Sequence, residues 1–200
     1  MQLILASASP RRADLLRSAG FEFSTRIVDI DEQVRPGETP EIYVRRLAAE
    51  KSFAASADGR PAEAGRNDPA DEDPTIVLAA DTAVVIDGEI LGKPRDAPDA
   101  ERMLRLLRGR EHEVITGVSL RRGAYELGRV ETTRVEFGPL TEADIVWHVA
   151  SGEWHDKAGG YAIQGLASRF IRGIHGSYSN VVGLPIAAVH ELLAEIASGG

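Results

Sequence analysis

The chain has 200 residues, a formal net charge of −8 at pH 7, and no cysteine. This length is enough for one α/β core, or for one core with two lobes. The acidic balance argues against a general nucleic-acid or membrane-surface binder, because such proteins carry a basic patch or stripe. The absence of cysteine excludes disulfides, thiolate metal sites and a cysteine nucleophile, and it makes a cytoplasmic setting the simplest expectation.

Hydrophobic periodicity and turn signals predict a mixed order of strands and helices. In chain order we expect a strand over 3–6, a helix over 10–18, a strand over 21–28, a helix over 40–55, a strand over 75–80, an extended segment over 83–86 with a hairpin return over 89–91, and a helix over 96–108. A strand over 113–121, a further strand or hairpin over 125–137, a helix from 141 to about 151 and a final helix from 185 follow.

The turn after the first strand breaks a local rule. Ser9 suits the N-cap of the first helix and Pro10 suits its first position. Arg11 and Arg12 then follow in the first turn, where the helix dipole and the unpaired N–H groups are already positive. Rules that fail without a structural gain tend to fail at functional sites. We interpret this turn, with the hydroxyl of Ser7, as a phosphate or polyphosphate site, the alternative being two arginines that point into solvent.

An acidic segment lies between the second strand and the second helix. Residues 29–33 contain three carboxylates, a pattern that is most often a solvated turn. The alternative is that Glu32 helps to hold a divalent cation, since Mg²⁺ prefers oxygen ligands.

The second predicted helix begins at Thr39 and Pro40 as N-cap and first residue. Its apolar stripe is expected to contain Ile42, Leu47 and Phe53. Lys51 near the end of this helix is typical of a surface residue, and composition gives it no role. Residues 56–74 are rich in Pro, Gly and Asp, which favours a flexible surface insertion over a domain linker.

A buried strand over 75–80 is followed by Asp81 and Thr82. Open α/β sheets place ligands beyond the carboxyl ends of their strands, so a carboxylate at this point is a candidate for catalysis or metal binding. The alternative is an aspartate that simply forms a turn.

Residues 156–165 form a second unusual stretch, Asp-Lys-Ala-Gly-Gly-Tyr-Ala-Ile-Gln-Gly. Paired glycines allow close backbone approach or positive φ, and Gln164 offers the donor and acceptor that reading a base edge requires. The alternative is an irregular surface loop. The histidine spacings and the lack of G-x-S-x-G, Walker A and G-x-G-x-x-G motifs argue against a zinc hydrolase, a serine hydrolase and the common nucleotide-binding loops.

Several stretches together resemble one family, the Maf nucleotide pyrophosphatases. One such motif would be weak, but five in order are specific, and they cover nearly the whole chain. The Tyr-Ala-Ile-Gln-Gly sequence at 161–165 resembles the branch that hydrolyses dTTP and UTP, and it departs from the Ser-Glu-Gly type expected for the branch that acts on 7-methyl-GTP. The five stretches are Ser7–Arg12, Ala80–Thr82, Lys93–Pro94, Asp156–Gly165 and Gly176–Pro185.

The resemblance implies a single α/β domain over residues 1–200 of the Maf/Ham1 (ITPase-like) type, with a mixed, bent β-sheet flanked by helices and two lobes with a cleft. It implies hydrolysis of a nucleoside triphosphate between the α- and β-phosphates, which makes the protein a hydrolase of acid anhydrides. It also implies a divalent metal cofactor, Mg²⁺ or Mn²⁺, and a homodimer. We expect no nucleic-acid or membrane partner.

The resemblance further implies a role for each matching residue. Asp81 matches the general base and, with Glu32, the metal site. Lys51 and Lys93 match catalytic cations. The substrate-binding positions are Ser7, Arg11, Arg12, Thr82 and Gln164, of which Arg12, Thr82 and Gln164 set selectivity. Two alternatives stay open: a different nucleotide such as a modified pyrimidine or 7-methyl-GTP, and a non-catalytic, nucleotide-binding regulator of septum formation.

Overall fold

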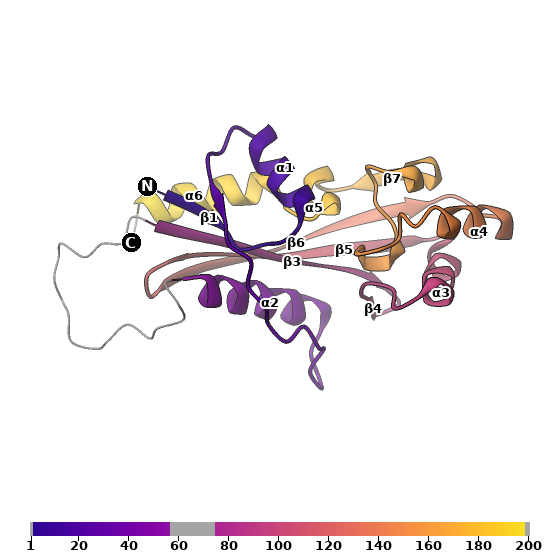
Figure 1. Cartoon of the computed structure of the whole chain (residues 1–200), viewed down its shortest axis with the longest axis horizontal. Coiled ribbons are helices and arrows are strands. Elements are labelled where there is room, and N and C mark those ends of the chain that lie inside the picture. Colours follow the sequence, from indigo (N-terminus) through magenta and orange to yellow (C-terminus); the bar gives the residue numbers. More distant parts are fainter. Residues whose placement is uncertain (1, 57–74, 199–200) are drawn as a thin grey trace. The chain divides into compact units, whose positions relative to one another are not determined.

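The computed structural model describes residues 2–56 and 75–198. The predicted insertion over 56–74 therefore lies, apart from Ser56, outside the described residues. The elements, shown in Figure 1, are β1 (Gln2–Leu5), α1 (Pro10–Ser18), β2 (Ser24–Thr25), α2 (Pro40–Ala55), β3 (Thr75–Ile86), β4 (Glu89–Leu91), α3 (Ala97–Leu107), β5 (Glu111–Arg122), β6 (Tyr125–Phe137), α4 (Glu142–Ala150), the 3₁₀ helices η2 (Ala158–Gly160) and η3 (Leu166–Phe170), β7 (Ile171–His175), α5 (Tyr178–Val182) and α6 (Ile186–Ser198).

The described strands form one mixed sheet in the order β2-β1-β3-β5-β6-β7, and β4 pairs with β3. The prediction of a mixed α/β fold is confirmed. None of the helices in the described part of the chain is long and apolar enough to cross a membrane.

The chain divides into two compact units, each with its own hydrophobic core. The first unit contains the described residues of Met1–Asp81, Thr116–Val130 and Gly183–Gly200, and the second contains Thr82–Ile115 and Glu131–Val182. Strands β3, β5 and β6 each contribute residues to both units.

The sheet of the first unit is covered on both faces. β1 pairs in parallel with β2 and β3, with Leu5 opposite Leu78. Leu3 and Leu5 join the core that includes residues of α1 and α6, whereas Ile4 joins a second core that includes a residue of α2. Because successive strand residues point to opposite faces, this alternation places α1 and α6 on one face and α2 on the other (Figure 1).

Helix α2 begins as predicted, because Thr39 caps it by accepting a hydrogen bond from the Ile42 N–H at 3.4 Å. The predicted stripe, however, is wrong at two of its three positions, since Ile42 is 54% exposed and Phe53 is 49% exposed. The buried face consists of smaller residues, which let the helix approach the sheet closely: Val44, Leu47, Ala48, Ser52 and Ala55.

At Gly117 on β5 the backbone of α2 comes close to the sheet. A Cβ added to Gly117 would lie 2.4 Å from the Val44 carbonyl oxygen. Backbone atoms of α2 cannot move aside as a flexible side chain could, so we expect Gly117→Ala to lower the free energy of unfolding by roughly 2 kcal/mol or more. Denaturant unfolding measures the change. Gly92→Ala is the matched control, because nothing lies within 4 Å of its added Cβ, and equal losses in the two variants would contradict the expected clash.

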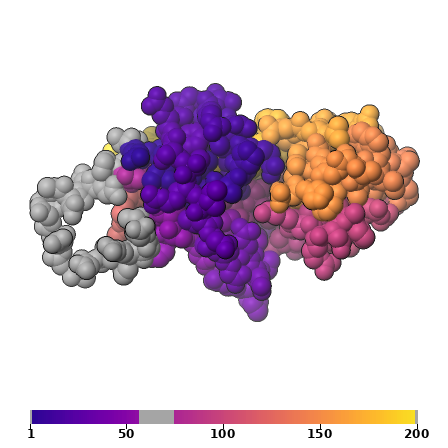
Figure 2. Space-filling view, viewed as in Figure 1, coloured from indigo at the N-terminus to yellow at the C-terminus, as the bar shows by residue number. Residues whose placement is uncertain are grey.

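The second unit packs helices α3 and α4 against each other and against the sheet. Figure 2 shows the magenta and orange segments of this unit as one continuous surface. Thr141 and Asp144 form the capping box predicted at the start of α4. His112 is buried against the rings of Phe137 and Tyr161, and this burial lowers the pKa of His112 to about 4.

Two strand predictions need correction, and two short elements were missed. The strand predicted over 21–28 is reduced to Ser24–Thr25, because Phe21 and Phe23 pack against the hydrophobic core that β1, β3, β5, α1 and α6 form in the first unit. The strand predicted over 75–80 continues without a break through Asp81 to Ile86. The short elements β7 and α5 were not predicted, since neither is long enough to show a clear period.

Candidate functional site

The turn between β1 and α1 has the predicted position. Ser9 is the N-cap residue of α1, but within the described part of the chain its side chain makes no capping hydrogen bond. Instead, the Ser9 N–H donates to Ser7 Oγ at 3.1 Å. Arg11 and Arg12 occupy the first turn and both are half-buried. The Ser7 hydroxyl therefore stabilises the turn before α1, and the Ser9 hydroxyl does not cap the helix.

Arg12 ties this turn to two other parts of the first unit. Its Nε donates to the Gly183 carbonyl at 2.7 Å, and its Nη1 donates to the Ala80 carbonyl at 2.7 Å. Nη1 also lies 3.4 Å from Ser7 Oγ. Burial lowers the pKa of Arg12, and the nearby Asp81 carboxylate opposes that shift. The alternative of an arginine that points into solvent is wrong for Arg12.

One lysine joins the two predicted acidic residues. Lys51 Nζ lies 2.6 Å from Asp81 Oδ1 and 2.6 Å from Glu32 Oε1. The side chains of Lys51 and Asp81 are only 11% and 12% exposed, and that of Glu32 is 46% exposed. The interpretation of Lys51 as an ordinary surface residue is therefore wrong. The cluster is a partly desolvated place where two carboxylates share one positive charge.

Asp81 reaches this cluster because neighbouring strands end at different points. β1 ends at Leu5, which pairs with Leu78, whereas β3 continues past Asp81. Asp81 thus lies beyond the carboxyl end of β1, although it lies in the middle of its own strand. The turn after β1 and the carboxylate of β3 meet for this reason, as parallel α/β sheets predict.

Two residues of α2 hold the loop that carries Glu32, and no local pattern in the sequence selects them. Tyr43 Oη donates to the Glu32 carbonyl at 3.0 Å, and Arg46 Nη2 donates to the Gln33 carbonyl at 3.0 Å. Burial, reinforced by the charges of Asp81 and Glu32, raises the pKa of Tyr43 to about 12, so its hydroxyl remains a donor at neutral pH. Their i, i+3 spacing is visible in the sequence, but the loop that they bind is not.

The remaining predicted residues belong to the second unit. Thr82 is half-buried on β3, and Lys93 is exposed just after β4. Gln164 is exposed in a turn that the Gly165 N–H closes on the Ala162 carbonyl at 3.1 Å.

The glycine pair has the predicted positive φ, with 67° at Gly159 and 73° at Gly160. The Gly159 N–H donates to the Gly92 carbonyl at 3.1 Å. This bond brings the loop that carries Gln164 beside the segment that carries Lys93.

The donors of the cluster can be tested against a divalent cation. Among residues 2–56 and 75–198 no group of three or more acidic, His or Cys side chains could hold a metal. Mg²⁺, however, is commonly held by one or two carboxylates together with substrate phosphates and water. Glu32 and Asp81 already share the Lys51 ammonium, so this position attracts a cation. The pair fits Mg²⁺ or Mn²⁺ bound in that way.

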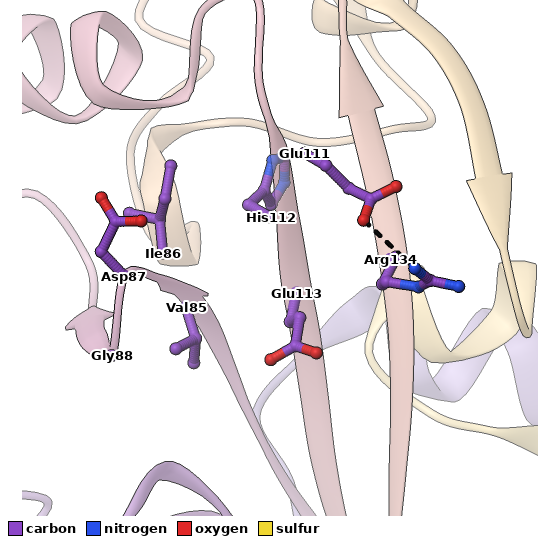
Figure 3. Close-up of a pocket in the computed structure, with 8 residues that line it drawn as sticks. All are labelled: Val85, Ile86, Asp87, Gly88, Glu111, His112, Glu113 and Arg134. Atoms are coloured by element: carbon purple, nitrogen blue, oxygen red, sulfur yellow. Dashed lines mark hydrogen bonds and ion pairs between the residues drawn. The ribbon is translucent and has the colours of Figure 1, made fainter.

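A separate pocket lies at the β3–β4 hairpin of the second unit, and Figure 3 shows Arg134 beside Glu111 in it. Arg134 Nη1 lies 3.4 Å from Glu111 Oε1. None of the residues that line this pocket is a predicted site residue. They are Val85, Ile86, Asp87, Gly88, Glu111, His112, Glu113 and Arg134.

Comparison with known proteins gives matches over nearly the whole chain. The family model for Maf-like protein matches residues 2–196. A dTTP/UTP pyrophosphatase of Anaeromyxobacter sp. (strain Fw109-5) is 50% identical over 197 residues, which cover 96% of this chain and 88% of that protein. A dTTP/UTP pyrophosphatase of Shewanella sp. (strain MR-7) is 48% identical over 200 residues, with 98% of each chain covered.

The fold also has a counterpart among solved structures. The Ham1 protein of Staphylococcus aureus matches with a TM-score of 0.52 at 14% identity, and the match covers 98% of this chain and 99% of that one. At this identity the match concerns the fold, and it confirms the predicted Ham1-type architecture. The family itself follows from the sequence matches over nearly the whole length: this chain belongs to the Maf family.

Proposed function

We propose that this protein hydrolyses dTTP and UTP to the nucleoside monophosphate and pyrophosphate. The observation that carries the proposal is the Lys51–Asp81–Glu32 cluster in the same unit as the Ser7–Arg12 turn. We infer the identity of the nucleotide from the names of two relatives that are about half identical to this chain over nearly its whole length. We further propose that the protein acts in the cytoplasm as a homodimer, on the basis of its composition and its family resemblance.

In this proposal Asp81 prepares water for attack. Its carboxylate accepts a proton from a water molecule as the water oxygen forms a bond to the α-phosphorus. The bond between that phosphorus and the bridging oxygen breaks, and pyrophosphate leaves with the bonding electron pair. Lys51 holds the Asp81 carboxylate in place through its 2.6 Å contact. A general base of this kind needs a fixed orientation more than a large change in basicity.

Positive groups of the chain would bind the triphosphate. Arg11, on the first turn of α1, offers a guanidinium that matches phosphate geometry, and the nine-residue helix adds its N-terminal dipole. Lys93 would contribute a further cation to the negative charge that develops on pyrophosphate. A divalent cation held by Glu32 and Asp81 would supply additional neutralisation of the phosphates.

We propose that Gln164 and Thr82 read the base. Uracil and thymine share a carbonyl/N–H edge and differ by one methyl group, and an apolar pocket distinguishes one methylene or methyl group by only about 10–200-fold. Acceptance of both dTTP and UTP is therefore reasonable. An amide such as Gln164 can donate to a carbonyl and accept from an N–H of that edge at the same time.

Gln164→Glu tests this role. The carboxylate keeps the size of the side chain but loses the amide donor, so we expect kcat/KM for UTP to fall by about 10-fold or more. Rates with GTP should change much less. Steady-state pyrophosphate release measures both. Gln2→Glu is the control, because Gln2 is exposed on β1 in the other unit. Unchanged relative rates across nucleotides would contradict the base-reading role.

The proposed function as a whole is tested by pyrophosphate release from a panel of triphosphates with Mg²⁺ and with Mn²⁺. We expect UTP and dTTP to be the best substrates. Preference for 7-methyl-GTP or for a modified pyrimidine would change the substrate in this proposal but not the type of reaction. Tight nucleotide binding without pyrophosphate release would favour the alternative of a non-catalytic regulator.

A further inference from the structure

Glu153, in the turn after α4, binds the start of η3. Its Oε1 accepts a hydrogen bond from the Leu166 N–H at 2.8 Å, and its Oε2 lies 3.3 Å from the Ala167 N–H. Gly165, the N-cap residue of η3, has no side chain that could cap these donors. Glu153, which precedes Leu166 by 13 residues, thus makes the hydrogen bond that an N-cap side chain would normally make. Hydrogen bonds to a carboxylate are stronger than those between neutral groups, so this end of the loop is well anchored.

Gly165 is shaped by the same contact. A Cβ added to Gly165 would lie 1.8 Å from Glu153 Oε1. The backbone itself does not demand glycine, because φ at Gly165 is −109°. Glycine at position 165 therefore leaves room for the Glu153 carboxylate. Any larger side chain there would push Glu153 away from the Leu166 and Ala167 N–H groups.

His148 on α4 holds the other end of the same loop. Its ring is fully buried, and its Nε2 donates to the Gly160 carbonyl at 3.0 Å. Its Nδ1 lies 3.9 Å from Glu153 Oε2. Helix α4 and the turn after it thus fasten the backbone both before Tyr161 and after Gly165.

We propose that Glu153, supported by His148, is a positioning residue that sets the conformation of the turn over 161–165 and so the direction of Gln164. This inference rests on the proposed function, in which Gln164 reads the base. Gln164 is exposed, whereas its backbone lies between two anchored points. Glu153 has no contact with substrate in this proposal, and it acts through the loop.

Two single variants remove the contact from opposite sides. Glu153→Ala deletes the acceptor, and Gly165→Ala displaces it while Glu153 is retained. In both we expect KM for UTP to rise about tenfold and the preference for UTP over GTP to fall by a similar factor, with kcat changed less than about threefold. Glu153→Gln keeps one oxygen acceptor and should give an intermediate value. Glu142→Gln, which removes a carboxylate paired with Arg105 and Arg108 in the same unit, is the control and should match the wild type.

The double variant and amide hydrogen exchange separate positioning from a general loss of structure. Both substitutions remove the same contact, that of Glu153 with the start of η3. The KM of the double variant should therefore be little higher than that of either single variant. Exchange at the Leu166 and Ala167 amides should quicken in Glu153→Gln while the melting transition of the whole protein is retained.

Two failures can be told apart. A wild type that releases no pyrophosphate from any triphosphate would overturn the proposed function. An active wild type, with KM and nucleotide preference unchanged in Glu153→Ala and Gly165→Ala, would overturn the positioning role alone. A fall in kcat at constant KM and constant preference would also overturn it.

Discussion

Asp81→Asn is expected to lower kcat for UTP by about 10²–10⁴-fold, the usual range for a positioned acid–base group. Asparagine has nearly the same shape but cannot accept the proton of the attacking water. The side chain is only 12% exposed and touches Lys51, so bulk water is poorly placed to take over its role. Pyrophosphate release at saturating UTP measures kcat, and the KM from the same titration separates catalysis from binding.

Asp87→Asn provides the matched control for Asp81→Asn. Asp87 also pairs with a basic residue, Arg110, but it lies in the exposed turn before β4. Its φ of 52° is one that asparagine adopts readily, so the variant should fold and turn over UTP normally. Near-normal turnover of Asp81→Asn would mean that another group activates water, and the assignment of the base would be wrong.

Arg12→Ala is expected to lower the free energy of unfolding by roughly 3–5 kcal/mol, because two charge-assisted hydrogen bonds to carbonyls are lost together. Those carbonyls belong to Ala80 and Gly183, which the guanidinium joins to the first helical turn. Arg12→Lys should be intermediate, since one ammonium cannot reproduce the planar fork. Denaturant unfolding measures all three proteins. We also expect the loss of UTP hydrolysis in Arg12→Ala to persist well below its melting temperature.

Arg17→Ala, on the same helix, is the control for Arg12→Ala. Arg17 is 63% exposed and pairs with the equally exposed Asp14. Such surface pairs contribute about 0–1 kcal/mol, so Arg17→Ala should unfold close to the wild type. If Arg12→Ala unfolded like Arg17→Ala, the guanidinium would not be a structural tie, and its effect would have to come from substrate binding alone.

Local signals predicted the helices well. Thr39 with Pro40, and Thr141 with Asp144, mark the start of α2 and α4 because capping and proline geometry involve only neighbouring residues. Apart from Leu47, the buried face of α2 was not predicted, because it is chosen by where the helix meets Gly117, 73 positions after Val44 in the chain. Side-chain hydrophobicity alone favoured Phe53, which is half exposed.

The residues of the candidate site could be selected from the sequence, but their contacts could not. The unusual Ser7–Arg12 turn and the Asp81 carboxylate could be selected from local patterns, and the family resemblance added Lys51. The bonds that place them could not be foreseen, because Arg12 meets Gly183 across 171 positions and Ala80 across 68. Glu153 was missed for the same reason, since its partners come from a turn that has no regular pattern.

If the proposed divalent cation binds at Glu32 and Asp81, the Lys51 ammonium makes folding independent of that binding. Two carboxylates in a partly desolvated place repel each other, and many metal sites cannot form until a cation compensates that repulsion. Here the compensating charge is part of the chain, 2.6 Å from both Glu32 and Asp81. The polypeptide can therefore reach its folded state before any divalent ion arrives, and it can acquire the proposed cation together with the triphosphate. Chelation should then abolish turnover while leaving the fold intact, unlike in a zinc finger, where the two are lost together.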